Sequence, residues 1–291
     1  MTAVTFGWKA SQQHFTIGEY RQLWTLVDQA GFDSCWVFDH LRPMGRDRGG
    51  DIFEAWTTLA AMAALTSRVR LGTLVTGNGY RHPALLAKMA ATVDHISGGR
   101  LDVGLGAGGD PGADEMAGFP SWPARERVER LDESARILRG LWTNPSTTFA
   151  GRHYQLRDAV SDPKPVQPHL PLWLASNGER RGLRVVAEHA DVWLTATFED
   201  RPGDLSRLSE ILSDHCRAIG RDPATLRRAA QFPLPETRDE ILRATERFLR
   251  AGFTTLVFMP RGGGLARVDQ AATLLPELRT LEPPATYTTT A

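Results

Sequence analysis

The sequence predicts a single (β/α)8 barrel, also called a TIM barrel, within the α/β class. Two observations lead to this prediction. Short apolar runs alternate with amphipathic helices along the chain, and eight such units fit into 291 residues, a usual length for this barrel. The runs are almost continuously apolar, as is typical of parallel strands covered by helices. An open, doubly wound sheet would alternate in the same way and remains the alternative from the pattern alone.

The first four units occupy residues 4–142. Their strands are expected at 4–8, 34–38, 69–75 and 100–105, and their helices at 18–30, 53–65, 83–95 and 125–142. Pro83 suits the first turn of the third helix, where no backbone donor is needed. A long glycine-rich loop without helical periodicity separates the fourth strand from the helix at 125–142.

The alternation breaks between Pro145 and Pro171. Residues 147–149 and 154–156 flank Gly151 and predict a short hairpin, inserted after the fourth helix. Four further units follow, with strands at 172–175, 192–195, 228–232 and 254–259 and helices at 179–189, 204–219, 238–251 and 268–278. We therefore expect one domain over residues 1–282 and a disordered, threonine-rich tail over 283–291.

The composition excludes several classes of function. Lys plus Arg equals Asp plus Glu at 34 each, which argues against a nucleic-acid or membrane-surface partner. Only Lys9, Lys88 and Lys164 are lysines, which we interpret as codon usage. Cys35 and Cys216 stand far apart, and no cysteine or histidine spacing predicts a metal site. With no secretion signal and no apolar run of about 18 residues, we expect a cytoplasmic protein.

In a barrel of this kind, chemistry takes place where the carboxyl ends of the strands meet, here called the barrel mouth. The residues that follow the predicted strands are therefore the candidates for function. They are Lys9, Asp39–His40, Thr76–Asn78, Ala107–Gly109, Ser176–Gly178, Thr195 and Pro260–Arg261.

Two glycine-containing segments suggest ligand contacts. Gly104–Gly109 matches GxGxxG, but no helical period follows until about Arg125, so a loop that lets a flat ligand approach the backbone is preferred over a dinucleotide fingerprint. Ser176–Gly178 lies between a strand and a helix predicted from Glu179, where free amides suit a phosphate. An ordinary N-cap explains the second segment equally well.

Asp39–His40 ends the second strand, where the imidazole can donate to an anionic ring oxygen or carry a proton. A structural histidine is the competing explanation. Trp8 and Trp122 are candidates for stacking on a bound ring, although core packing is the usual role of tryptophan. No serine or cysteine nucleophile motif is present in the sequence.

Four ordered motifs resemble the luciferase-like monooxygenase superfamily, particularly its branch of coenzyme F-420-dependent oxidoreductases. They are VRLGTLVTGNGYRHPALLAKMAATVDHISGGRLDVGLGAG at 69–108, AGFDSCWVFDHL at 30–41, FAGRHYQLRDA at 149–159 and PKPVQPHLPLWLASNGERRGLRVVAEHADVW at 163–193. The resemblance is strong over about 31–193, whereas the last third of the chain matches only in its alternation of strands and helices.

The resemblance implies a barrel that holds FMN or the 8-hydroxy-5-deazaflavin coenzyme F-420 in its mouth. His40 would hold the ring and act as the catalytic residue, a cis peptide at Leu74–Val75 would brace it, and the phosphate would lie near Ser176–Gly178. The full cofactor set that it implies is Asp39, His40, Leu74, Val75, Thr76, Asn78, Gly106, Ala107, Gly108, Ala175, Ser176, Asn177, Gly178 and Thr195. It also implies a homodimer built through the early helices.

The chain departs from its relatives after the fourth strand. Where related members often carry a Trp or Glu and a second acid, this sequence has Gly109-Asp110-Pro111. A proton donor at that position is therefore in doubt, with Asp110 and Glu115 as weak substitutes, and the site is expected to be reshaped for a specialised substrate. Its pocket is expected to take a planar or partly anionic molecule, between Trp8, His14, Trp122, Phe232 and Arg261.

The leading hypothesis is hydride transfer from reduced deazaflavin to an activated double bond, imine or carbonyl of an organic substrate. The alternative within enzymes is an FMN-dependent monooxygenase that receives reduced flavin from a separate reductase. A third hypothesis is a cofactor-binding or assembly protein without catalysis, which the Gly109–Asp110 departure keeps open.

Overall fold

Eight parallel strands close into a barrel in the computed structural model, which describes residues 4–45, 47–197, 204–261 and 264–282. The strands are β1 (Thr5–Lys9), β2 (Ser34–Val37), β3 (Arg70–Thr73), β5 (Leu101–Gly106), β8 (Leu172–Ala175), β9 (Val192–Ala196), β10 (Arg227–Pro233) and β11 (Thr255–Met259). Pairing of β1 with β11 and of β3 with β5 closes the ring. The predicted barrel is confirmed, and the open sheet is ruled out.

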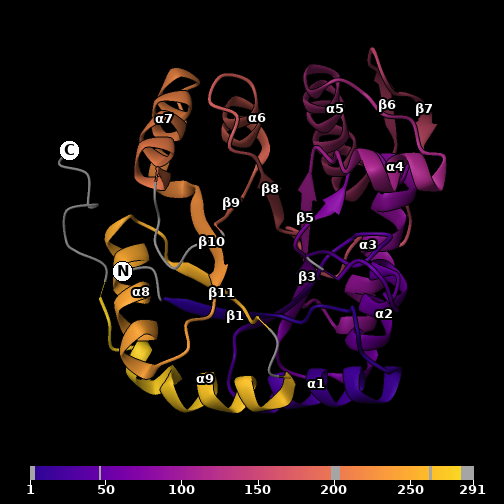
Figure 1. Ribbon diagram of the computed structural model, residues 1–291. Coiled ribbons are helices and arrows are strands. Elements are labelled where there is room, and N and C mark those ends of the chain that lie inside the picture. The colour runs from indigo at the N-terminus through magenta and orange to yellow at the C-terminus, as the bar shows by residue number, and fades with distance from the viewer. Residues whose placement is uncertain (1–3, 46, 198–203, 262–263, 283–291) are drawn as a thin grey trace.

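Helices surround the barrel, as Figure 1 shows. They are α1 (Ile17–Gln29), α2 (Ala55–Leu65), α3 (Pro83–Ser97), α5 (Ala124–Thr143), α6 (Gly182–His189), α7 (Leu205–Ala218), α8 (Arg238–Arg250) and α9 (Gly264–Leu278). Pro83 is the first residue of α3, as predicted. The helices α1 and α9 lie side by side although they stand at opposite ends of the sequence. Among the described residues, none of the helices has both the length and the apolar character that a membrane crossing requires.

The segment after β5 differs from the prediction. Where a loop without helical period was expected, α4 covers Pro111–Ala117. Asp110 caps this helix by accepting a hydrogen bond from the amide of Ala113, and Gly118 ends it with a positive φ of 71°. Seven residues make only two turns, which is too short for an apolar period to stand out in the sequence.

Three further boundaries need correction. The hairpin of β6 (Thr147–Ala150) and β7 (Gln155–Ala159) forms as predicted, but it follows α5, the fifth helix rather than the fourth. The third strand is not continuous over 69–75, because β3 ends at Thr73 and β4 (Thr76–Gly77) resumes the pairing with β5. Helix α6 begins at Gly182 instead of Glu179. The predicted tail, 283–291, lies outside the described residues.

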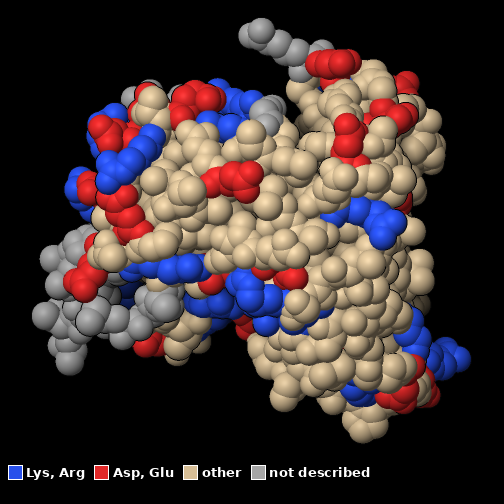
Figure 2. All heavy atoms as spheres, turned by 90° about the horizontal axis from the view of Figure 1, so that it is seen from below, with Lys and Arg blue, Asp and Glu red and all other residues tan. Residues whose placement is uncertain are grey.

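The apolar core has two layers. One cluster fills the barrel interior and consists of Trp36, Leu74, Trp173, Val192, Leu194, Ala229 and Val257, with the rings of Trp36 and Trp173 4.5 Å apart. The larger cluster lies between the strands and the helices. Basic and acidic side chains are interspersed on the face that Figure 2 shows, and much of that face carries neither.

Candidate active site

The wall of the barrel mouth is interrupted at the break between β3 and β4. The Leu74–Val75 peptide bond is cis, as the family resemblance implied. The side chain of Val75 lies against β5, because a Cβ added to Gly106 would come within 2.7 Å of Val75 Cγ2. A Cβ on Gly104 would come within 1.9 Å of the Thr73 carbonyl oxygen. The first glycines of the GxGxxG segment therefore let the interrupted strand pack closely against β5.

Thr76 is fully buried, and its hydroxyl is committed to the protein. It accepts a hydrogen bond from Trp56 Nε1 at 2.9 Å and donates to Thr73 Oγ1 at 3.0 Å, which in turn donates to the Gly104 carbonyl. In this structure the hydroxyl of Thr76, a predicted cofactor residue, therefore bonds within the protein. Asn78 is buried nearby, and its backbone N–H donates to the Gly106 carbonyl at 3.0 Å.

Asp39 faces a partner that sequence reasoning missed. Its buried carboxylate accepts hydrogen bonds from Arg81 at 2.5 and 3.2 Å, and the same guanidinium donates to Glu54 at 2.5 Å. Burial raises the pKa of Asp39, and the charge of Arg81 opposes that rise. Glu54 also caps α2 through the amides of Trp56 and Thr57. Through Arg81, Asp39 thus links the end of β2 to the start of α2 and of α3, one residue before His40.

The His40 side chain is 31% exposed and lies at the end of β2. Its Nδ1 atom is buried without a hydrogen-bond partner among the described residues, 3.9 Å from the nearer carboxylate oxygen of Asp110. Burial and the charge of Lys9 lower the pKa of His40, which outweighs the opposite influence of Asp110. The lowered pKa favours the neutral imidazole, whose Nδ1 atom is buried without a partner among the described residues.

Lys9 completes this side of the barrel mouth; it was named as a strand-end candidate but not in the cofactor or substrate set. Its ammonium group lies over the ring of Phe38, 4.8 Å from the ring centroid, and Phe38 lies 5.3 Å from the ring of His40. Burial lowers the pKa of Lys9 to about 8. Its position directly after a strand was visible in the sequence, but its lack of an ion-pair partner was not.

Ser176–Gly178 forms a tight loop after β8 rather than the first turn of α6. Thr195 Oγ1 donates to Asn177 Oδ1 at 2.9 Å, and the Gly178 amide donates to Ser176 Oγ at 3.3 Å. The Gly178 carbonyl accepts from the amide of Leu183, inside α6. Predicted cofactor residues Ser176, Asn177, Gly178 and Thr195 are thus brought together by direct contacts.

Trp122 lies beside the loop that follows β4. A Cβ on Gly79 would lie 3.2 Å from its ring, and the guanidinium of Arg130 lies 4.0 Å from the ring centroid. Trp122 also lines a small cleft together with Ala107 and Gly108, so these predicted residues of the cofactor and substrate sets meet there.

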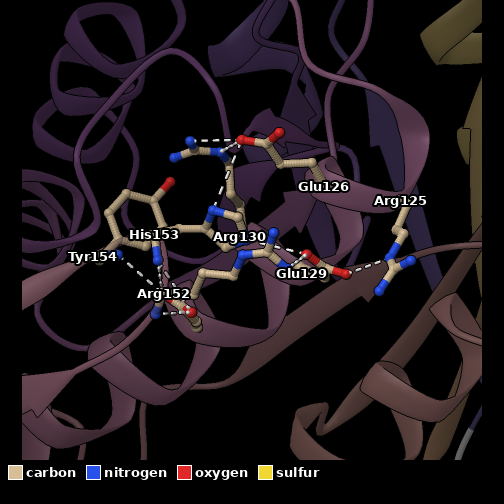
Figure 3. Close-up of polar contacts among 8 residues, drawn as sticks. Arg125, Glu126, Glu129, Arg130, Arg152, His153 and Tyr154 are labelled. Carbon is tan, nitrogen blue, oxygen red and sulfur yellow. Dashed lines mark hydrogen bonds and ion pairs between the residues drawn. The ribbon is translucent and has the colours of Figure 1, made fainter.

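Figure 3 shows the polar contacts that join α5 to the turn of the β6–β7 hairpin. Glu126 accepts two hydrogen bonds from Arg130, at 2.8 and 3.0 Å, and holds its guanidinium against Trp122. The ring of His153, in the β6–β7 turn, lies 3.3 Å from Glu129. Glu133 accepts from three consecutive amides of the turn, those of Arg152, His153 and Tyr154. The hairpin therefore supports the α5 side of the site.

The other predicted substrate residues are dispersed. Phe232 packs outward against Phe248 on α8, with ring centroids 4.3 Å apart, and does not face the barrel interior. Trp8 is fully buried against Phe32 in the outer layer, although it lines a cavity of about 350 Å³ together with Lys9 and His14. Arg261 is exposed directly after β11. Phe232 was predicted to line the substrate pocket, and in this structure it packs against the helices instead.

One group of potential metal ligands occurs among the described residues, Asp132, Glu188 and His189. Its ligand atoms already bind one another and nearby guanidinium groups. His189 lies 2.7 Å from Asp132, and Arg184 lies 2.8 Å from Glu188. This pattern fits a structural ion cluster between α5 and α6.

Comparisons with known proteins agree with this geometry. A family model described as luciferase-like monooxygenase matches residues 1–279. An uncharacterized protein of Mycobacterium tuberculosis is 35% identical over 60% of this chain and 60% of its own length. An F-420-dependent glucose-6-phosphate dehydrogenase of Microbacterium testaceum is 32% identical over 74% of this chain and 63% of its own length. The chain thus spans about three fifths of these curated relatives.

A solved structure of an F-420-dependent secondary alcohol dehydrogenase, in complex with an F-420–acetone adduct, superimposes with a TM-score of 0.84. The match covers 95% of this chain and 99% of that one at 20% identity. At this identity the likeness establishes the shared barrel fold.

Proposed function

Because the chain belongs to the luciferase-like monooxygenase family of enzymes, we propose that it binds coenzyme F-420 at the barrel mouth and catalyses hydride transfer to an organic substrate. The observation that carries this proposal is the arrangement at the end of β2. There Asp39 forms an ion pair with Arg81, and His40, whose lowered pKa favours the neutral form, has a nitrogen without a hydrogen-bond partner. The names of the relatives and of the superimposed dehydrogenase support the choice of cofactor.

The residues of the barrel mouth fit a planar ring. Val75 protrudes at the break in the third strand, and the glycines of β5 leave no side chain in front of it. Ala175, which pairs with Gly106 across the sheet, continues this shallow surface. His40 would hold the ring edge, and the backbone around Asn78 would meet its polar side. When bound, the deazaflavin supplies a two-electron hydride donor and acceptor.

The cofactor phosphate is assigned to Ser176–Gly178 and the residues that follow. The amide of Gly178 is held by Ser176 Oγ, and Arg180 and Arg181 are exposed directly after the loop. No ion pair involving either arginine occurs among the described residues, so both can meet a phosphate. The later start of α6 makes this a loop site with two guanidinium groups instead of a simple helix N-terminus.

The alternative is an FMN-dependent monooxygenase that receives reduced flavin from a separate reductase. The family description favours it, because luciferase-like monooxygenases give the family its name. The two tricyclic rings are alike in shape, so shape alone does not favour either cofactor at this site. Under either cofactor, the substrate is proposed to be an organic molecule of specialised metabolism.

Titration of the apo-protein with coenzyme F-420 and with FMN, followed by quenching of tryptophan fluorescence, tests the proposal. We expect saturable binding of coenzyme F-420 at submillimolar concentration and much weaker binding of FMN. Tight binding of FMN alone would replace the proposal with the monooxygenase.

A homodimer in the cytoplasm is the expected working form. Leu65 at the end of α2 and Leu85 and Ile96 on α3 are 49%, 54% and 44% exposed, which supports contact through the early helices. Size-exclusion chromatography with light scattering should give about twice the chain mass of 32.1 kDa. A monomer at micromolar concentration would contradict this expectation.

A further inference from the structure

Lys9 places a positive charge inside the barrel mouth. On β1, a Cβ at Gly7 would come within 2.5 Å of Ser34 Oγ and 2.8 Å of Trp36 Nε1, so Gly7 faces the barrel interior. Side chains alternate along a strand, and Lys9 therefore extends from the same face, in register with Trp36 on β2. Its carbon chain is partly buried, and its ammonium group ends beside Phe38.

This charge has no carboxylate partner among the residues that the structure describes. Asp39 turns away to Arg81, and Asp110 binds Arg42 at 2.9 Å. Of the other ionisable groups nearby, His40 is neutral and His14 shares only the cavity beside β1. A cation withdrawn from water without a counter-charge destabilises the protein, so its presence at a ligand site points to a negatively charged ligand.

The two candidate cofactors differ in the charge of their rings. The 8-hydroxyl of the deazaflavin is a phenol conjugated to the ring carbonyls, so it ionises readily and spreads negative charge over the ring. Oxidised FMN carries a methyl group at that position, and its ring is neutral at pH 7. The shapes are alike, whereas the charges of the rings are not.

We propose that Lys9 is a specificity-determining residue that stabilises the ionised deazaflavin ring and thereby selects coenzyme F-420 over FMN. This inference rests on the proposed function, since it concerns the same cofactor site. An ammonium suits the task because it is a compact charge on a flexible chain. It also explains why one of only three lysines in an arginine-rich chain stands at the end of a barrel strand.

The test compares the wild-type protein with Lys9→Met, Lys9→Arg and the control Lys88→Met on the exposed surface of α3. Two quantities are measured for each protein: the dissociation constants of coenzyme F-420 and FMN, and the pKa of the bound 8-hydroxyl, from its absorbance between pH 4 and 9. Thermal unfolding of each variant reports whether it is folded.

We expect Lys9→Met to raise the pKa of the bound 8-hydroxyl by about one unit and to weaken the binding of coenzyme F-420 about tenfold at pH 7. FMN affinity should stay the same. The difference in coenzyme F-420 affinity should vanish at a pH where the ring is protonated. Lys9→Arg should retain most of the wild-type behaviour, and Lys88→Met should retain all of it.

The assignment would be overturned if Lys9→Met weakened the binding of both cofactors equally, or if the pKa of the bound 8-hydroxyl stayed unchanged. Failure of the underlying function looks different, because the wild-type protein itself would then bind FMN and not coenzyme F-420.

Discussion

The carboxylate of Asp39 and the guanidinium of Arg81 form a two-point ion pair beneath the barrel mouth, with hydrogen bonds of 2.5 and 3.2 Å. Both side chains are largely buried, at 1% and 13% exposed. Because this pair fixes the residue before His40, its loss should affect both the stability of the fold and the site.

Replacement of Arg81 by Met leaves the Asp39 carboxylate buried without its partner. We expect the free energy of unfolding to fall by about 3–5 kcal/mol at pH 7. The loss should shrink as the pH falls, since protonation of Asp39, whose pKa burial already raises, removes the unpaired charge. Urea denaturation at several pH values measures both effects. Arg217→Met, at an exposed pair on α7, should cost at most about 1 kcal/mol.

Lys9→Met should stabilise the apo-protein at neutral pH. The folded-state pKa of Lys9 is about 8, below the ordinary value of 10.5, so the folded protein releases this proton before the unfolded chain does. The stability penalty is therefore fully present below pH 8 and is relieved between pH 8 and 10.5. We expect a gain of about 1–3 kcal/mol at pH 7 that disappears toward pH 10.5. A constant gain across this range would show that packing, and not charge, is responsible.

The pKa of His40 should respond to the same substitution. Burial first, and the charge of Lys9 second, lower this pKa from 6.5. Lys9→Met removes the second cause, so the imidazole should titrate at a higher pH than in the wild-type protein. Nitrogen-15 NMR of the histidine rings follows this directly, with His215 on α7 as an internal reference. An unchanged pKa of His40 would show that the charge of Lys9 does not influence this imidazole.

Gly106→Ala should impair cofactor binding more than it impairs folding. The added methyl group would lie 2.7 Å from Val75 Cγ2 and must push the Val75 side chain toward the ligand. We expect at least tenfold weaker binding of coenzyme F-420, measured by fluorescence. Gly18→Ala serves as the control, because its nearest neighbour is 4.0 Å away and the position lies in α1. That change should stabilise the helix by about 0.5–1 kcal/mol and leave binding intact.

Glu133 joins α5 to the hairpin through three backbone amides. Glu133→Ala leaves three amide donors without acceptors, of which that of Tyr154 is buried, so we expect a loss of about 1–3 kcal/mol in unfolding free energy. Hydrogen exchange at Arg152 and Tyr154 should accelerate more than exchange in β10. Uniform acceleration throughout the chain would indicate global destabilisation instead of release of the hairpin.

The order and type of the barrel elements could be predicted from the sequence because buried parallel strands and amphipathic helices have different periods. The location of the cis bond at Leu74–Val75 came from family resemblance. Position after a strand was enough to propose His40 and the Ser176–Gly178 loop as candidate site residues, since all strand ends of a barrel meet at one rim.

Two features could not be read in this way. Both faces of a barrel strand are buried, so an apolar run does not reveal which residues face inward. In β10 the interior side belongs to Ala229, and Phe232, three positions later, faces the helices. The ion pair of Asp39 and Arg81 joins residues 42 positions apart, and no local sequence pattern predicts it.

The scarcity of lysine has a consequence for how this protein responds to base. Arginines stay charged throughout the accessible range, and burial moves the pKa of Cys35, Cys216 and Tyr20 upward, with Tyr80 raised to about 12. Lys9 moves the opposite way, to about 8. Mild alkali should therefore switch off one charge at the centre of the site while these other groups keep their protons. A small rise in pH would thus reversibly remove the charge of Lys9, and with it the preference between the cofactors, without any mutation.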